Sequence, residues 1–349
     1  MKLIAFYLPQ FHPIAENDVW WGEGFTEWTN VSKAKPRFKK HYQPHKPSDL
    51  GYYDLRVPEV RSAQAELAAA HGIHGFCYYH YWFEGRRLLN EPLDAMLDSQ
   101  TPDFPFCLCW ANEHWTRRWD GKDQEILMRQ TYSQEDDVRH IQWLLNVFKD
   151  KRYIRVNGKP LLLIYQARAL PDPLRTAELW RSQAKKEGIG DIYLCGVESF
   201  PTEHGDPSVI GFDAAVGFQP EWGRLDKPIR PFWGSRAYQE NRIFDYKNIV
   251  EKMILKKSPA YRRFPCVFPS WDNSARREKN AAIFINSTPE LYEKWLRYTM
   301  ENYFREEDEK IIFINAWNEW GEGNHLEPCQ MWQRGYLEAT QKALRSVSR

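Results

Sequence analysis

Two glutamates, Glu319 and Glu322, are spaced so that they could supply acid–base chemistry. They lie in the run IIFINAWNEWGEGNHLEP, which begins as an apolar strand and then becomes polar, with tryptophans beside the acids. Cleavage of a glycosidic bond requires one carboxyl group that is protonated near the leaving oxygen and another that is ionised near the anomeric region. Two carboxyls in one turn can face the same cavity, where mutual repulsion and a neighbouring tryptophan raise one pKa above the other. The pair therefore predicts a site that cleaves bonds between sugars.

A purely structural role for the pair is the alternative. Acids in the first turn of a helix are stabilised by the helix dipole, and Glu319 and Glu322 could begin a helix that follows the strand. The flanking tryptophans and His325 are poor choices for an ordinary solvated turn. The glycines on either side of Glu322 also permit the backbone angles that a tight active-site loop requires. These neighbours favour the catalytic interpretation.

Aromatic residues are unusually abundant: 16 Trp, 18 Tyr and 19 Phe make up 15% of the chain. Many of the tryptophans stand beside Asn, Glu, His or Arg, and flat apolar faces next to hydrogen-bonding groups match the faces of a sugar ring. About half of these aromatics are expected simply to fill the core. The candidate stacking platforms are Trp20, Trp21, Trp28, Trp110, Trp115, Trp222, Trp271, Trp317 and Trp320. The candidate hydrogen-bonding partners are His12, His80, Asn112, Glu113, Gln219, Asn318, His325 and Glu327.

The elements that must position these residues can be read from the apolar runs. Eight runs are continuous rather than alternating, as expected of parallel strands that are covered on both faces. They span residues 2–8, 75–81, 104–110, 160–166, 192–197, 214–219, 264–271 and 310–317. Amphipathic stretches between them predict helices over residues 57–72, 134–149, 174–187, 245–257, 289–305 and 331–346. This alternation predicts an α/β fold, a (β/α)8 TIM barrel.

In such a barrel the carboxyl ends of the strands form one mouth, and nearly every predicted strand ends in polar residues. Long insertions are expected at about 9–50, 111–133 and 199–244, and long ordered loops in compact domains usually serve function. No proline-rich, glycine-rich or low-complexity linker divides the chain. We therefore expect a single catalytic domain over residues 1–349, with its binding site at that mouth.

The charge balance and the residue composition of the chain limit its possible partners. Charge is balanced, with 48 Lys and Arg against 47 Asp and Glu, so no long-range field attracts nucleic acid or an anionic membrane. We expect an oligo- or polysaccharide partner, and no metal or cofactor, because no ligand spacing or cofactor motif is present. The six cysteines fall mostly in strand-like runs without a CxxC pair, which is typical of reduced core residues. With no apolar segment long enough for a signal peptide or a membrane span, we expect a cytoplasmic protein.

The run WNEWGEGNHLEP resembles the signature of glycoside hydrolase family 99, the endo-α-1,2-mannosidases and endomannanases. The segment at residues 51–83 is similar to the second-strand region of that family. From FYLPQFHP through the C-terminal motif, almost the whole chain resembles the bacterial WbsX-like proteins. These are found with polysaccharide, lipopolysaccharide and O-antigen biosynthesis loci and are often labelled glycosyltransferases. Both resemblances imply a (β/α)8 barrel that acts on carbohydrate.

The family 99 resemblance also implies roles for the two acids. It implies a retaining, metal-independent mechanism on α-mannoside-type bonds, in which Glu319 is a base toward the sugar's own 2-hydroxyl and a 1,2-anhydro intermediate forms. Glu322 would then serve first as acid and later as base. The chain departs from the family pattern at Gly321, where family 99 usually has histidine. The insertions at 9–50 and 199–244, which would set sugar specificity, do not align with that family.

Two other functions remain open. A glycosyltransferase that uses a nucleotide sugar would be expected to show a phosphate cradle or a metal-holding acidic motif, and the chain has no GxGxxG, GxxxxGK or DxD. A non-catalytic sugar-binding module could hold a glycan in the same aromatic mouth, but it has no need for two mutually repelling buried acids. We therefore expect a glycoside hydrolase that acts on a bacterial surface or capsular polysaccharide or an O-antigen-related glycan.

Overall fold

The apolar runs close into a barrel of parallel strands in the computed structural model, which describes residues 1–117, 122–231, 236–304 and 309–347. Within these residues eight strands pair in the order β1-β14-β12-β10-β9-β8-β4-β2, and β2 also pairs with β1, which closes the ring. They are β1 (Lys2–Tyr7), β2 (Gly75–Phe83), β4 (Phe106–Trp110), β8 (Lys159–Ile164), β9 (Tyr193–Val197), β10 (Ala214–Gly217), β12 (Arg263–Val267) and β14 (Ile311–Ile314). The predicted (β/α)8 TIM barrel is confirmed.

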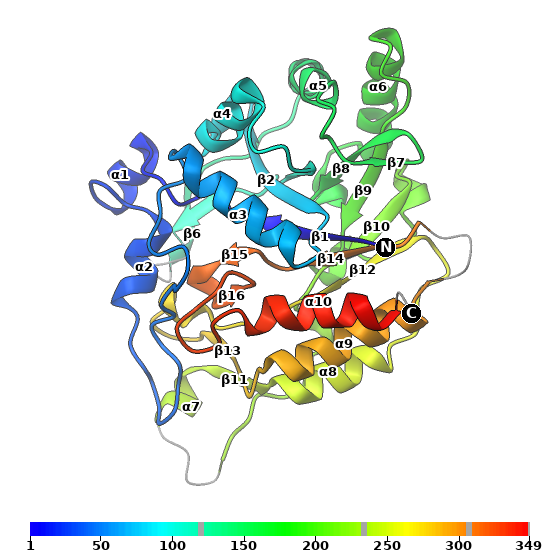
Figure 1. Cartoon of the computed structure of the whole chain (residues 1–349). Helices are drawn as coiled ribbons and strands as arrows, with labels where there is room; N and C mark the ends of the chain where they lie inside the picture. Colours follow the sequence, from blue (N-terminus) through cyan, green and yellow to red (C-terminus); the bar gives the residue numbers. More distant parts are fainter. Residues whose placement is uncertain (118–121, 232–235, 305–308, 348–349) are drawn as a thin grey trace.

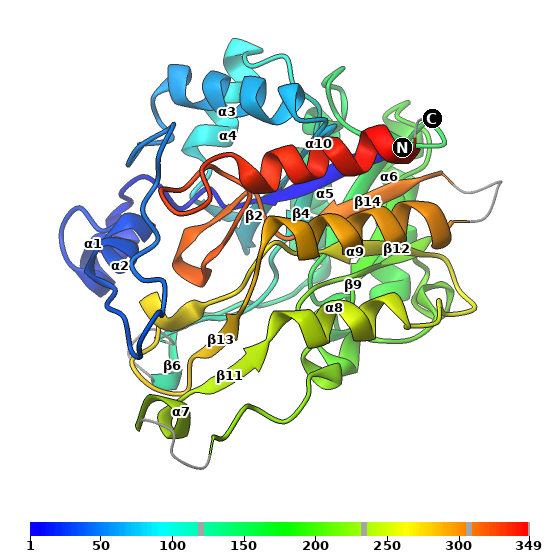
Figure 2. The ribbon, with the colours of Figure 1, turned by 60° about the horizontal axis from the view of Figure 1, so that its bottom comes forward.

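Helices cover the outside of the barrel, as Figures 1 and 2 show from two directions. Ser133, Asp172 and Thr288 each begin one of them by accepting a hydrogen bond from a backbone amide of the first turn. The helices are α3 (Pro58–Ala70), α4 (Glu91–Ser99), α5 (Gln134–Phe148), α6 (Pro173–Lys186), α8 (Tyr246–Ile254), α9 (Pro289–Asn302) and α10 (Gly335–Val347). All of these helices except α4 lie at the positions of the amphipathic stretches that predicted helices. Residue 305, the end of one predicted helix, lies outside the described residues.

The insertions carry elements of their own, and Figures 1 and 2 both place α1, α2 and β6 at one end of the barrel. The prediction of one insertion over 199–244 is corrected, because barrel strand β10 lies within it. Residues 118–121 and 232–235, which belong to two predicted insertions, lie outside the described residues. The additional α-helices and strands in the insertions are α1 (Ala15–Trp21), α2 (Glu27–Lys33), β5 (Trp115–Arg117), β6 (Lys122–Met128), α7 (Arg236–Glu240) and the start of β11 (Arg242–Asp245). Three further short strands lie outside the insertions, and they are β3 (Arg86–Leu88), β7 (Arg155–Val156) and β13 (Ala282–Ile285).

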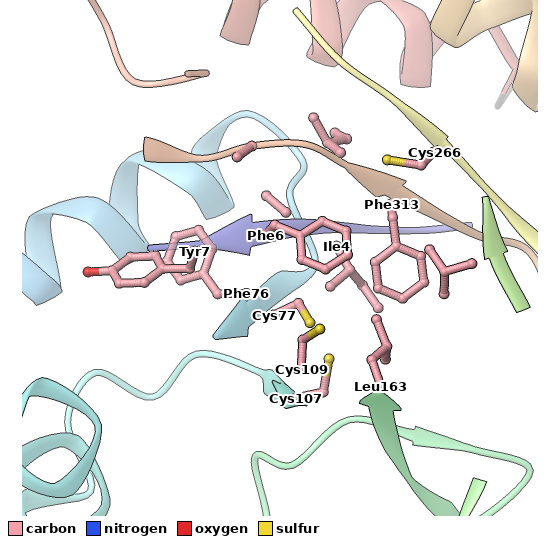
Figure 3. Close-up of a cluster of buried hydrophobic side chains, with 14 of the residues drawn as sticks. Ile4, Phe6, Tyr7, Phe76, Cys77, Cys107, Cys109, Leu163, Cys266 and Phe313 are labelled. Carbon is pink, nitrogen blue, oxygen red and sulfur yellow. The ribbon is translucent and has the colours of Figure 1, made fainter. Parts of the chain in front are cut away.

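Large side chains from several strands fill the barrel interior (Figure 3). The ring of Phe6 on β1 is fully buried and lies 5.2 to 5.6 Å, centroid to centroid, from the rings of Tyr79, Phe218 and Phe313. Burial of a phenylalanine of this kind contributes about 1.5–3 kcal/mol to stability. The interior is therefore packed and not open, and any ligand site must lie above this layer, at an end of the barrel.

The cysteines are part of this core, as predicted from their positions in apolar runs. Figure 3 shows the sulfur atoms of Cys77, Cys107 and Cys109 lying close together beneath Phe6. All six cysteines are buried and none forms a disulfide. They are Cys77, Cys107, Cys109, Cys195, Cys266 and Cys329.

Helix length bears on membrane association. At fifteen residues, α5 is the longest helix in the described part of the chain. A helix that spans a bilayer needs about 20 predominantly apolar residues. None of the described helices could therefore cross a membrane.

Candidate active site

Glu319 and Glu322 lie in a tight hairpin that follows the last barrel strand. The hairpin pairs β15 (Asn318–Glu319) with β16 (Asn324–His325), and the 3-10 helix η7 (Trp320–Glu322) joins them. Gly323 completes the turn with φ 57°, a left-handed conformation that glycine adopts without steric cost. The acids therefore do not begin the longer helix that the structural alternative proposed, because the next α-helix, α10, starts at Gly335.

Several residues that the sequence suggested as ligand contacts support this hairpin from below. Asn318 is fully buried and holds the end of β1, because its amide both accepts from Leu8 N at 2.7 Å and donates to Leu8 O at 3.0 Å. The ring of Trp320 stacks on His325 at a centroid distance of 3.7 Å, and its indole N–H donates to Glu327 Oε2 at 2.6 Å. These contacts hold the backbone on both sides of the acids.

A cavity of about 490 Å³ lies at the carboxyl ends of the strands, directly above the packed interior. Its volume is in the range of ordinary small-molecule sites. Each of the eight barrel strands, or the segment that follows it, contributes to the wall, and α1 and β11 add residues from the insertions. The predicted site residues that line the cavity are Trp21, Glu113, Trp115, Trp222, Trp271, Glu319 and Glu322. The structure therefore brings the two acids and four of the candidate tryptophans together.

The remaining candidates lie outside this lining, for identifiable reasons. Trp110, Trp317 and Trp320 are each at most 1% exposed, so their rings have no face open to a ligand. Trp20 packs edge-on against Trp115 at a centroid distance of 5.7 Å, and Trp28 donates its indole N–H to Tyr53 O. The buried polar candidates His12, His80, Asn112, Gln219, Asn318, His325 and Glu327 also lie outside it.

Most of these buried polar side chains have internal partners. His80 Nε2 lies 3.0 Å from His140 Nε2, and Asn112 bonds with the backbone of Gln166 in both directions. Gln219 donates to Met253 Sδ. Glu327 accepts from Tyr53, Gln64 and Trp320. These side chains hold together the strands and loops around the cavity, and they do not line the cavity itself.

One arginine joins the two acids. Arg276 lies just after the 3-10 helix η6 (Asn273–Ala275), which follows β12. Its Nη2 donates to Glu319 Oε2 at 3.0 Å, and its Nη1 lies 2.8 Å from Glu322 Oε1. The carboxyl groups therefore converge on a single guanidinium at the cavity wall.

Burial changes the protonation of this pair. Removal from water raises the pKa of Glu319 to about 8, and the negative charge of Glu322 adds to the effect while Arg276 opposes it. Burial also raises the pKa of Glu322, again against the lowering effect of Arg276. Because the two groups interact, the proton that they retain at neutral pH belongs to the pair. The pair therefore consists of two carboxyls that retain protons more readily than free glutamates, a property that acid–base catalysis can use.

Several lining residues were not predicted from the sequence. Tyr79 and Tyr165 form part of the cavity floor, and Arg242, Arg276 and Arg277 come from the segments around η6 and β11. The signal for Arg276 was present, since it follows a predicted strand at the correct end. Its contact with acids more than forty positions along the chain left no local pattern. No group of three or more His, Cys, Asp or Glu side chains in the described ranges has the arrangement of a metal site.

The raised pKa of Glu319 predicts a pH-dependent stability. The folded pKa of about 8 exceeds the ordinary glutamate pKa of 4.5, so the stabilising contribution is fully present below about pH 4.5 and is lost as the pH rises through 8. The wild-type free energy of unfolding should therefore fall over this window, and Glu319→Gln should make it fall less. Urea unfolding at pH 5, 7 and 9 measures both. Parallel pH profiles for the two proteins would contradict the prediction.

Comparison with known proteins identifies the family of this chain. The family model described as Glycosyltransferase WbsX matches residues 3–340. The chain belongs to the WbsX family. Two WxcX proteins from strains of Xanthomonas campestris pv. campestris, described as uncharacterized, are 43% and 42% identical to this WbsX-family chain over 347 residues. The match covers 98% of the chain and 49% of each relative, so the chain spans about half the length of these relatives.

Solved structures share the barrel of this WbsX-family chain. The GH99 endo-alpha-mannosidase from Bacteroides thetaiotaomicron superposes with a TM-score of 0.60 at 16% identity, covering 99% of this chain and 97% of that one. A structure described as a glycoside hydrolase-like protein superposes with a TM-score of 0.62 at 14% identity, covering 98% and 93%. At such identities the likeness shows a common fold. The resemblance to WbsX-like proteins is thus confirmed as family membership, and the resemblance to family 99 is confirmed as a common fold.

Proposed function

We propose that this chain is a retaining, metal-independent glycoside hydrolase whose acid–base pair is Glu319 and Glu322. The observation that carries the proposal is the convergence of two carboxyls with raised pKa values, Glu319 buried and Glu322 partly buried, on one wall of a cavity lined by tryptophans. The aromatic rings of Trp115, Trp222 and Trp271 offer stacking surfaces for sugar rings beside these acids. The names of the two solved structures, both of glycoside hydrolase type, point to the same class of reaction.

The proposed steps follow the roles that family 99 implies. Ionised Glu319 removes the proton of the sugar 2-hydroxyl, and O2 attacks C1 while the bond from C1 to the leaving oxygen breaks. Protonated Glu322 gives its proton to that leaving oxygen, and a 1,2-anhydro sugar remains. Glu322 then takes a proton from water, the water oxygen attacks C1 while the bond from C1 to O2 breaks, and Glu319 returns its proton to O2. Two displacements at C1 retain the configuration, and both acids end as they began.

The proposed substrate is a bacterial polysaccharide or an O-antigen-related glycan with α-mannoside-type bonds. The endo-alpha-mannosidase name of one structural relative supports the bond type. The description of the family as a glycosyltransferase favours a second candidate, glycosyl transfer at the same cavity. The two candidates differ in what accepts the sugar, since water is the acceptor in hydrolysis and a hydroxyl group is the acceptor in transfer.

Mass spectrometry of reaction products separates these candidates. The chain is incubated with α-mannosides and bacterial polysaccharides, and in parallel with nucleotide sugars and acceptor glycans, with and without a divalent metal. Hydrolysis predicts new reducing ends that carry ¹⁸O from labelled water, without any nucleotide sugar. Consumption of nucleotide sugar with a lengthened acceptor would support transfer instead. Glycan binding with no product in either arm would support the binding module and overturn both.

A further inference from the structure

A third carboxylate lies directly behind the two reactive acids. Glu27, the first residue of α2, is fully buried, and its Oε1 accepts a hydrogen bond from Arg276 Nε at 2.8 Å. The other two nitrogens of this guanidinium face Glu319 and Glu322. Each nitrogen of Arg276 therefore meets a different carboxyl group, and the rigid plane of the guanidinium fixes the three relative to one another.

Gly321 provides the space that this arrangement occupies. A Cβ placed on Gly321 would lie 1.7 Å from Glu27 Oε1 and 2.8 Å from Arg276 Nε, far inside van der Waals contact. Its backbone is not in the left-handed region, so no conformational need for glycine exists at this position. The absent side chain instead lets the Glu27 carboxylate reach Arg276 directly beneath the turn between Glu319 and Glu322.

The charges in this cluster do not cancel. If all three carboxyls were ionised, they would carry three negative charges against the positive charges of Arg276 and of Arg277, which also lowers the pKa of Glu322. Glu27 adds to the repulsion that raises the pKa values of both Glu319 and Glu322, behind the larger effect of burial. A negative charge beneath the pair therefore favours the retention of a proton by the reactive acids.

We propose that Glu27 and Arg276 are positioning residues, which orient Glu319 and Glu322 and fix the charge that the pair can carry. Arg276 sets the geometry, because it contacts both acids. Glu27 holds Arg276 from behind and supplies the extra negative charge, in space that Gly321 leaves open. This inference deepens the proposed function, on which it rests, by giving the hydrolase a third acid that does not itself need to touch the substrate.

Other charged or titratable groups border the cluster. Arg277 follows Arg276 on the same segment, and Glu113 lines the same cavity from the segment after β4. Three tyrosines on β2 and after β8 also interact electrostatically with the acids, and they are Tyr79, Tyr81 and Tyr165. These groups are unchanged in the variants below, so an altered pH profile in those variants reports the loss or displacement of the Glu27 charge.

The variant Glu27→Gln tests the effect of the negative charge of Glu27, because glutamine has nearly the same shape as glutamate. The amide oxygen of glutamine can still accept from Arg276, but the negative charge is gone. Removal of that charge should lower both apparent pKa values in the profile of kcat/KM by about one unit. The carboxyl ¹³C chemical shifts of labelled glutamate, followed by NMR between pH 4 and pH 10, measure the same change without any substrate. Circular dichroism verifies that the variant is folded.

The variant Gly321→Ala tests whether the positions of Glu27, Arg276 and the two acids matter for catalysis. The new methyl group must displace the Glu27 carboxylate, so kcat should fall about a hundredfold with little change in KM, because the acids are misplaced by a fraction of an ångström or more. Gly223→Ala is the matched control: its Cβ would meet nothing closer than 3.5 Å and its φ is not positive. Activity close to that of the wild type is expected for the control.

The outcomes separate this inference from the proposed function. A wild-type chain that cleaves no glycan overturns the proposed function, while the NMR titration still decides whether Glu27 controls the protonation of the pair. A wild-type chain that cleaves a glycan, together with a Glu27→Gln variant whose pH profile and ¹³C titration match the wild type, overturns the inference alone. A Gly321→Ala variant as active as Gly223→Ala would also overturn it.

Discussion

Replacement of either Glu319 or Glu322 with glutamine is expected to lower kcat for glycan cleavage by about 10²–10⁴-fold, the usual contribution of general acid–base catalysis. Glutamine has nearly the same shape, so the hairpin and its contacts should persist and KM should change little. Steady-state kinetics with the cleaved glycan measure the loss. Glu301→Gln is the control, because Glu301 is an exposed acid on α9, and its activity should equal that of the wild type.

The same variants assign the two roles. A substrate with a good leaving group does not require protonation of the leaving oxygen, so the variant that lacks the acid should recover activity on such a substrate. If Glu322 is the acid, Glu322→Gln recovers on an activated aryl glycoside and Glu319→Gln does not. Recovery by Glu319→Gln alone would reverse the roles and would follow the raised pKa of Glu319. Full activity of both variants on the natural glycan would remove the pair from the mechanism.

Glu198→Gln is expected to destabilise the fold by roughly 3–5 kcal/mol, the cost of breaking a buried ion pair by removing one partner. The Glu198 side chain is 1% exposed, and its Oε2 accepts from Arg263 Nε at 2.6 Å. Tyr261 donates to the other carboxylate oxygen. Arg263 itself is 6% exposed, and without the charge of Glu198 it retains a longer ion contact with Glu221, at 3.9 Å, beside an interaction with the side chain of Tyr303.

Urea denaturation at neutral pH measures this loss. Asp226→Asn is the comparison, because the ion pair of Asp226 with Lys252 has both side chains more than two-fifths exposed and should contribute no more than about 1 kcal/mol. A double variant that replaces both Glu198 and Arg263 with apolar residues should regain part of the stability, since no buried charge is left alone. A loss in Glu198→Gln no larger than that in Asp226→Asn would contradict the prediction.

These two predictions also show where the sequence is informative. The strand residues and most helices follow from apolar periodicity and from caps such as Ser133 and Thr288, because these signals are local. The end of the barrel at which the cavity lies also follows from the sequence, because the carboxyl ends of all parallel strands of a barrel lie at the same mouth.

The orientation of individual side chains at the strand ends could not be predicted. Trp110 and Trp115 both come at or just after the end of β4, yet only Trp115 lines the cavity, while Trp110 packs against Trp180 of α6. Trp110 is the last residue of β4, whereas Trp115 begins β5 in the segment that follows. Glu198 and Glu319 likewise each follow an apolar run. Glu198 nevertheless pairs with Arg263, whereas Glu319 lines the cavity. Such partners lie tens of residues away, so no local pattern records them.

The buried thiols in the barrel interior give this protein a built-in reporter of opening. Because every cysteine side chain is enclosed in the folded state, a maleimide reagent can reach a sulfur atom only in molecules that have transiently come apart. The rate of modification therefore counts opening events directly, without an added label. Residues on different strands, such as Cys77, Cys195 and Cys266, would show by mass spectrometry whether the barrel separates as one unit or one part at a time.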